Sequence, residues 1–356
     1  MTTDPPLVSV IIPCFNAGAM LGPALKSVLG QTWPNLEIIF VDNNSTDGSL
    51  ATARDVLEGQ GRPFQVLTCA EQGVNHARNL GFSLAGGDFI QWFDADDELA
   101  PTKIALQAAA MQADPAIDIA YGDWVEARMA PGQPPRLLPH RLRQDDDQLA
   151  RTLAGAWYPP HLYLIRRAAA ERLQAAQAWF PGRPVATDVE YSAIAALMGM
   201  AFRHVPEAIV RYNLWSGSQI GSTIGYSRRV AVLEAIFTRL KGWSGQVALS
   251  ERHRVLLNQN WKVWRMAPDA VTLAKLPGRR FRLTRKADGR SRDLRPREAE
   301  VARMLLAAAR PLTTCHYALM LAETVAALGG DHALAVQAME RLQAEGFMQE
   351  VDPSRL

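Results

Sequence analysis

The 356-residue sequence has few cysteines, no long apolar run and almost no net charge. Its three cysteines are widely spaced, so we expect neither a disulfide framework nor a cysteine metal site. No stretch of about 18 uninterrupted apolar residues occurs, which argues against a membrane span. The N-terminus also lacks the basic and apolar regions of a signal peptide. These absences predict a cytoplasmic protein, either free or bound peripherally at the inner face of the membrane.

The formal net charge of +2 is too small to indicate an anionic partner. The exception is the basic stretch at 278–297, GRRFRLTRKADGRSRDLRPR. We interpret it as a solvated linker or hairpin, and the alternative is a patch for nucleic acid, phosphate or an acidic partner. The length and the hydrophobic content of 48% fit a globular protein of two domains.

The first hundred residues alternate strand-like and helix-like segments. Short apolar, β-branched or aromatic runs occur at 7–12, 36–41, 64–68 and 88–93, and helical patterns occur at 18–31, 50–59 and 73–85. This alternation predicts βαβ units, hence an α/β fold with a mainly parallel sheet. In such sheets ligands bind beyond the carboxyl ends of the strands.

Polar side chains follow three of these predicted strands. Asn16 comes after the first strand, Asp42 comes after the second, and Asp94, Asp96 and Asp97 follow the fourth. Carboxylates packed this closely repel one another unless water, hydrogen bonds or a cation compensates. The sequence therefore predicts a polar site at one edge of the sheet.

The following segments give weaker patterns. Residues 121–143 indicate a strand, a Pro/Gly turn and a second strand, and 160–173 indicate a strand followed by a helix. Residues 186–200 form a helical pattern with Asp188 and Glu190 in its first turn. From residue 226 onward helical patterns dominate.

Five blocks support a resemblance to a known family. They are PCFN at 13–16, QTWPNLEI at 31–38, VDNNSTDG at 41–48, ARNLG at 77–81 and DADD at 94–97. Together they resemble the family 2 glycosyltransferases, which have a GT-A fold. The resemblance is close over 7–110 and loose over 155–225, and it implies a GT-A domain at 1–225.

The resemblance implies a donor site for a nucleotide sugar, most simply a UDP-sugar. It places Pro13, Phe15, Asn16 and Asp42 around the nucleoside and Arg78 at the diphosphate. Alternatively, Asp42 caps a turn and Arg78 forms a salt bridge to Asp94 or Asp42. A divalent cation, Mn²⁺ or Mg²⁺, is expected at Asp96, with Asp94 reaching it through water or contacting the ribose, because such cations prefer carboxylate and phosphate oxygens. Asp97 is expected either beside them or as a turn cap.

The same resemblance supplies a catalytic base. The family carries a Glu-Asp pair at the start of a helix below the acceptor, and this sequence has Thr187-Asp188 there. Asp188 is therefore the predicted base, Glu190 is the fallback, and helix capping is the alternative role. The family also often carries Y-R-x-H-x-x-S after this helix, whereas this sequence has Asn213 and Trp215 in that stretch. Trp215 is predicted to stack on an acceptor or donor ring.

The C-terminal third lies outside the resemblance. We expect a helical extension at 226–275 and a small domain at 276–356, in which a hairpin turns at Ala287-Asp288-Gly289 and three amphipathic helices follow. This order resembles a winged-helix module. We favour a helical subdomain that forms a homo-oligomer or completes the acceptor cleft over a module that binds protein, peptide or nucleic acid.

The sequence thus predicts an inverting, metal-assisted glycosyltransferase that moves a sugar from a nucleotide sugar to a saccharide, lipid-linked or protein acceptor. The alternative is a nucleotide-sugar-binding regulatory protein that acts through its C-terminal module. Asp42, Arg78, Asp94, Asp96 and Asp188 favour the enzyme, and the departures from the family pattern keep the alternative open.

Overall fold

The structure is a computed structural model. It describes residues 4–130, 132–142, 144, 147–153, 158–215, 226–243, 248–250, 253–254, 257, 263–265, 270–277, 280–295, 298–299, 302–303, 306, 312–313 and 341–351. The chain divides into two compact units. The first comprises residues 1–148 and 157–224, and the second comprises residues 149–156 and 225–356. Residues 149–156, which lie within the domain predicted at 1–225, therefore group with the second unit.

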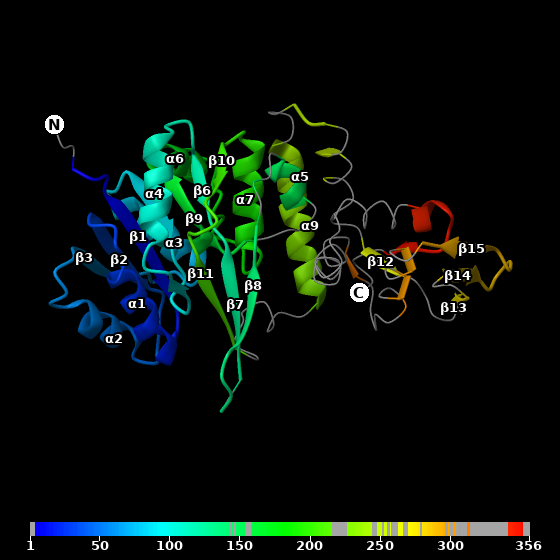
Figure 1. Cartoon of the computed structure of the whole chain (residues 1–356), viewed down its shortest axis with the longest axis horizontal. Helices are drawn as coiled ribbons and strands as arrows, with labels where there is room; N and C mark the ends of the chain where they lie inside the picture. Colours follow the sequence, from blue (N-terminus) through cyan, green and yellow to red (C-terminus); the bar gives the residue numbers. More distant parts are fainter. Residues whose placement is uncertain are drawn as a thin grey trace. The chain divides into compact units, whose positions relative to one another are not determined.

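The first unit is built around a seven-stranded sheet with strand order β10-β6-β9-β4-β1-β2-β3 (Figure 1). Its strands are β1 (Val8–Cys14), β2 (Leu36–Asp42), β3 (Phe64–Thr68), β4 (Phe89–Trp92), β6 (Ile119–Tyr121), β9 (Tyr163–Arg166) and β10 (Phe202–His204). Only β9 runs antiparallel to its neighbours; the other pairs are parallel. Every residue of β1 and β4 is buried, as a sheet covered on both faces requires. The predicted α/β class is confirmed.

Helices connect these strands. They are η1 (Gly18–Met20), α1 (Leu21–Leu29), α2 (Ser49–Leu57), α3 (Val74–Leu84), α4 (Lys103–Ala113), η2 (Pro160–Leu162), α6 (Arg167–Ala175) and α7 (Thr187–Leu197). Helix α3 lies on β1 and β2. Its Gly81 permits that approach, because a Cβ there would come within 2.5 Å of the Ile11 side chain. This close contact fixes the helix on which Arg78 stands one turn earlier.

A second sheet has the strand order β5-β11-β7-β8. Its strands are β5 (Glu98–Leu99), β7 (Trp124–Met129), β8 (Arg136–His140) and β11 (Val210–Trp215). Strand β5 starts directly after Asp97 and pairs antiparallel with β11. This pairing brings residues after α7 to the aspartates that follow β4, although more than 110 residues separate Asp97 from Asn213.

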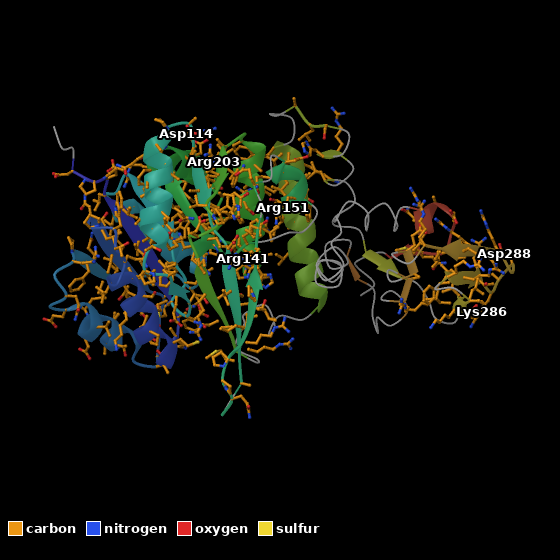
Figure 2. All side chains as sticks on the ribbon, in the orientation of Figure 1. Asp114, Arg141, Arg151, Arg203, Lys286 and Asp288 are labelled. Carbon is orange, nitrogen blue, oxygen red and sulfur yellow. The ribbon has the colours of Figure 1, made fainter. Side chains whose placement is uncertain are left out.

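The second unit contains α5 (Gln148–Leu153), α9 (Tyr226–Trp243) and two small sheets. One sheet comprises β12 (Val263–Arg265), β16 (Leu312–Thr313) and β17 (Gln349–Val351), and the other comprises β13 (Val271–Leu276), β14 (Arg280–Arg285) and β15 (Ser291–Leu294). Strands β14 and β15 confirm the predicted hairpin, and its exposed turn carries Lys286 and Asp288 (Figure 2). The helices predicted after it fall largely outside the described residues.

The basic stretch lies in this hairpin and pairs with acidic residues of its own unit. Arg282 pairs with Asp293 across the strands, and Arg285 bonds Asp288 in the turn. These contacts favour the solvated hairpin over an unpaired basic patch. Within the described part of the chain, no helix has the length and apolarity needed to span a bilayer.

Candidate active site

The carboxyl ends of β1 and β2 are tied together by side chain to main chain hydrogen bonds. Asn16, in a left-handed conformation with φ of 51°, accepts a hydrogen bond from the Thr46 N–H at 2.7 Å. Its own N–H donates to Ser45 Oγ at 3.0 Å. Asp47 accepts from the N–H groups of Gly18 and Ser49 at 2.8 and 3.0 Å. The turns after the two strands thus form one braced surface.

The predicted nucleoside-binding residues lie on or beside these turns. Pro13 is buried in β1, while the next aromatic side chain, Phe15, is 51% exposed. Asp42 is buried, and its Oδ2 accepts from the Ser45 N–H at 3.3 Å. Its Oδ1 has no hydrogen-bond partner among the described residues. An exposed ring beside a buried carboxylate oxygen with spare capacity can recognise a base that presents an N–H group.

Arg78 is the central cation of the site. It stands on α3, is 4% exposed, and its Nη2 lies 2.8 Å from Asp94 Oδ1. Its Nη1 donates to Asn75 Oδ1 and Thr187 Oγ1, both at 3.3 Å. The predicted alternative, a salt bridge to Asp94, is therefore confirmed. The bridge holds the guanidinium in place at a site where phosphate oxygens can also bind it.

The three aspartates after β4 differ strongly in their electrostatics. Burial opposes ionisation of Asp94, but the charges of Arg78 and His161 hold its pKa well below the usual range. Burial and the neighbouring Asp94 charge raise the pKa of Asp96 to about 6. Burial and both neighbouring carboxylates raise the pKa of Asp97 well above its usual value. The cluster is therefore short of positive charge.

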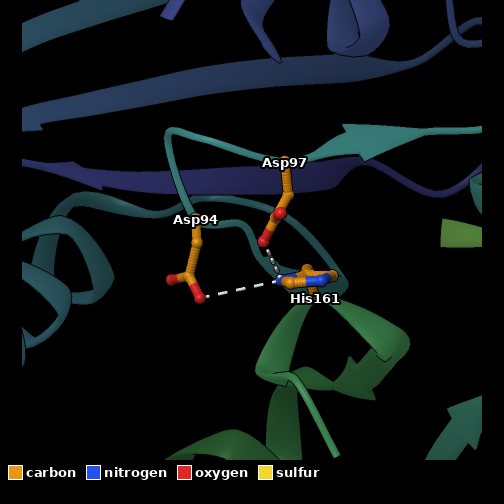
Figure 3. A group of neighbouring side chains, drawn as sticks. All are labelled: Asp94, Asp97 and His161. Carbon is orange, nitrogen blue, oxygen red and sulfur yellow. Dashed lines mark ion pairs between the residues drawn. The ribbon is translucent and has the colours of Figure 1, made fainter. Parts of the chain in front are cut away.

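Asp97 and Asp94 point towards the ring of His161, which comes from η2 (Figure 3). His161 Nδ1 lies 3.4 Å from Asp97 Oδ2 and 3.7 Å from Asp94 Oδ2. One ligand atom from each of the three residues lies within 4.8 Å of the other two. Within the described part of the chain, Asp97 Oδ2 and both ring nitrogens of His161 have no hydrogen-bond partner. Buried polar atoms rarely stay unpaired, so this group fits a divalent cation.

The predicted cation ligand Asp96 is not a member of this group, whereas Asp94 is. Asp97, for which a turn cap was the alternative, is fully buried and accepts a hydrogen bond from the Asn213 N–H at 2.7 Å. The Asn213 side chain donates to the Asp96 carbonyl oxygen at 2.9 Å. Asn213, at a position where the family pattern is lost, thus holds the aspartate loop from β11.

Asp188 lies in the first turn of α7, close enough to Arg78 and Asp94 for their charges to affect it. Burial raises the pKa of its carboxyl group to about 6, and the Arg78 charge opposes this rise. Such a group is a suitable proton acceptor near neutral pH. By contrast, Glu190 is fully buried, and its carboxylate bonds Arg183 at 2.8 and 3.4 Å. These contacts do not support the fallback role and favour Glu190 as an anchor of α7.

The site thus combines the braced turns after β1 and β2, the buried Arg78 on α3, the acidic group with His161, and Asp188 on α7. Comparison with known proteins agrees. Residues 9–174 match the model for glycosyl transferase family 2. Over these residues the chain is similar to glycosyl transferase family 2.

Individual proteins support the assignment of the domain. An uncharacterized glycosyltransferase of Haemophilus influenzae is 36% identical over 102 residues, which cover 29% of this chain and 41% of that protein. The matched segment thus spans less than half of the curated relative. S. aureus TarS 1–349, solved with UDP-GlcNAc, has a TM-score of 0.57 at 18% identity, covering 72% of this chain and 71% of that one. GalNAc-T7, solved with UDP, GalNAc and Mn²⁺, has a TM-score of 0.50 at 19% identity, and the match covers 67% of this chain and 50% of that one. The fold is GT-A.

Trp215 and His161 differ in how they compare with the predictions from the sequence. The side chain of Trp215, predicted to stack on a sugar, lies outside the described residues although its backbone ends β11. His161 was missed, because one histidine in the segment YPPHLYLI carries no spacing signal of a metal ligand. Only the antiparallel pairing of β9 with β4 brings it beside the aspartates.

Proposed function

We propose that this protein is a glycosyltransferase that moves a sugar from a nucleotide sugar, most simply a UDP-sugar, to an acceptor hydroxyl with inversion. One observation carries the proposal: Arg78 pairs with Asp94 at 2.8 Å, and both lie close enough to Asp188 for their charges to affect its carboxyl group. A cation that binds diphosphate and a carboxylate that accepts a proton are the two groups a single displacement needs. The UDP complexes of TarS and GalNAc-T7 support a UDP-linked donor.

In the proposed reaction the acceptor oxygen attacks the anomeric carbon and its proton passes to the Asp188 carboxylate. The bond from that carbon to the diphosphate oxygen breaks, and the electron pair leaves with the diphosphate. Arg78 stabilises the negative charge that develops there. Attack from the face opposite the leaving group inverts the anomeric centre.

A divalent cation, Mn²⁺ or Mg²⁺, fits the acidic group. Asp94, Asp97 and His161 would hold it, with Asp96 beside them. When bound, it would supply positive charge to the diphosphate oxygens. The Mn²⁺ in the GalNAc-T7 structure supports this assignment.

The two departures from the family pattern support turnover over the regulatory alternative. Thr187, which replaces a glutamate, still accepts a hydrogen bond from Arg78. Asn213, where the family motif is lost, donates hydrogen bonds to the Asp97 carboxylate from its main chain and to the Asp96 carbonyl oxygen from its side chain. Neither substitution leaves the arginine or the loop without support, so the machinery stays assembled.

The test is ligand-dependent thermal stabilisation. Wild type, Arg78→Ala and Arg203→Ala are each screened with UDP-, GDP- and dTDP-sugars, with Mn²⁺ or with EDTA. Arg203, on β10, is the matched control, because it pairs with Asp114 at the end of α4, at 3.1 Å (Figure 2). We expect one sugar nucleotide to raise the melting temperature of wild type and Arg203→Ala only with metal, because a ligand of the native state stabilises it by mass action. No response from wild type to any nucleotide would contradict the proposal.

Turnover is then measured as release of the free nucleoside diphosphate from the donor that binds. Release that accelerates with an acceptor fraction from cell extract, and that Asp188→Asn abolishes, supports the enzyme. A donor that binds but is never consumed would favour the regulatory alternative.

A further inference from the structure

Trp179, a residue between α6 and α7, lies between the phosphate-binding arginine and the helix of the candidate base. Its side chain is 2% exposed. The Arg78 guanidinium carbon lies 4.2 Å from the centre of its ring, and the Tyr191 ring is stacked on it at 4.1 Å with 19° between the planes. Two groups this close to one ring centre cannot share a face, so they occupy opposite faces of the indole.

The contact with Arg78 has a clear electrostatic reason. The guanidinium is buried, its Nη atoms donate to Asn75, Thr187 and Asp94, and its Nε has no hydrogen-bond partner among the described residues. The negative face of an indole stabilises a cation that has lost water in this way, and tryptophan does so better than the other aromatic residues. The ring therefore fixes the plane of the guanidinium. The hydrogen bonds donated by Nη1 and Nη2 fix how the guanidinium is turned within that plane.

The backbone around Trp179 is bonded to the helix that carries Arg78. Asn79 donates to the Trp179 carbonyl oxygen at 3.1 Å, and Asn75 donates to the Phe180 carbonyl oxygen at 2.9 Å. Both asparagines stand on α3. These bonds attach the loop to α3 at two successive residues, so the indole cannot move independently of Arg78.

The other face of the indole contacts Tyr191, which stands on the same helix as the candidate base Asp188. Tyr191 follows Asp188 by three residues on α7, and residues at this spacing lie on the same side of a helix. The Tyr191 hydroxyl accepts a hydrogen bond from Trp92 Nε1 at 3.1 Å, which holds the ring against the sheet. The stack of Arg78, Trp179 and Tyr191 thus connects the donor side of the site to the acceptor side.

We propose that Trp179 is a positioning residue that holds Arg78 in the orientation that binds the donor diphosphate. The proposal rests on the proposed function, and it makes a selective prediction. Loss of the indole weakens binding of a nucleoside diphosphate, whose phosphates Arg78 contacts. It leaves binding of the nucleoside alone unchanged, because the base is held at the β1 and β2 turns.

The experiment measures dissociation constants for UDP and for uridine by calorimetry, with Mn²⁺ present. Trp179→Met keeps an apolar side chain but removes the aromatic face. Trp179→Phe keeps an aromatic face that is smaller than that of indole. From the strength of buried cation–π contacts we expect Trp179→Met to weaken UDP binding by about 5- to 30-fold with uridine unchanged. Trp179→Phe is expected to recover most of the loss. Trp33→Met is the matched control, because Trp33 is also buried but bonds Pro6 near the N-terminus.

The outcomes separate the two proposals. If wild type does not bind UDP, the UDP-linked donor site fails and the role of Trp179 fails with it. If wild type and Trp179→Met bind UDP equally, or if the variant loses UDP and uridine affinity in the same ratio, only the positioning role is overturned. Should Trp179→Met not fold, the same ratio is measured on Trp179→Phe, where a loss confined to UDP is expected and an unchanged UDP affinity overturns the role.

Discussion

The Arg183–Glu190 ion pair offers a test of the anchoring of α7. Glu190 is fully buried, and Arg183 is 12% exposed and bonds both of its carboxylate oxygens. Removing one member of a buried pair costs about 3–5 kcal/mol, because the other charge stays in a poorly solvated place. Arg183 keeps some contact with water, so we expect Arg183→Met to lower the free energy of unfolding by about 3 kcal/mol.

For a domain of this size, that loss corresponds to a fall in melting temperature of about 6–12 °C. The assay is urea unfolding followed by circular dichroism, with thermal melting as a second measurement. Arg203→Met is the control, since Arg203 and Asp114 form an exposed pair. Its loss should cost less than about 1 kcal/mol.

The double variant Arg183→Met with Glu190→Met removes both charges, so neither member of the pair stays buried without its partner. It should recover most of the lost stability, since apolar replacement of a buried pair is often neutral. If the single variant costs less than about 1 kcal/mol, or if the two single changes are additive, the pair does not anchor α7. Glu190 would then again be a candidate base.

Three further predictions concern the site. Because burial raises the pKa of Asp188 to about 6, and the base acts only when ionised, the kcat of donor hydrolysis should rise with pH through about 6 and then level off. Asp188→Asn should be at least about 100-fold slower and lack this step in its pH profile. Asn213→Ala, which loses the bond to the Asp96 carbonyl, should weaken Mn²⁺ binding by about 10-fold in calorimetric titration. His161→Gln should weaken Mn²⁺ binding, whereas the control His204→Gln, which loses a contact to Asp123, should not.

The elements of the first hundred residues could be predicted from the sequence because their signals are local. The apolar runs at 7–12 and 36–41 correspond to β1 and β2 to within two residues, and the helical pattern at 73–85 corresponds to α3. A buried parallel strand is visible in the sequence as an apolar run bounded by turn residues. A helix is visible as apolar residues that recur every three or four positions. The strand ends then placed Asp42 and Asp94 at one edge without any knowledge of tertiary contacts.

The rest of the site depends on contacts between distant segments. His161 reaches the aspartates through the antiparallel strand β9, and Asn213 reaches them through β11, which pairs with β5. Neither pairing leaves a periodic signal at the residue concerned. Trp179 likewise looks like an ordinary core aromatic in the sequence, and only its 4.2 Å approach to the Arg78 guanidinium distinguishes it.

The substitutions at Thr187 and Asn213 have a common physical logic. A glutamate at 187 would place a second carboxylate beside Arg78, in addition to Asp94. Threonine retains an acceptor for the guanidinium without that charge, so more of the positive charge of Arg78 remains available to a diphosphate. Asn213 likewise adds no charge while it bonds the loop that carries Asp96 and Asp97. His161, from another element, supplies an imidazole beside Asp94 and Asp97. The chain thus departs from the family pattern that it resembles at residues that support the site, while the charges that the proposed reaction needs remain.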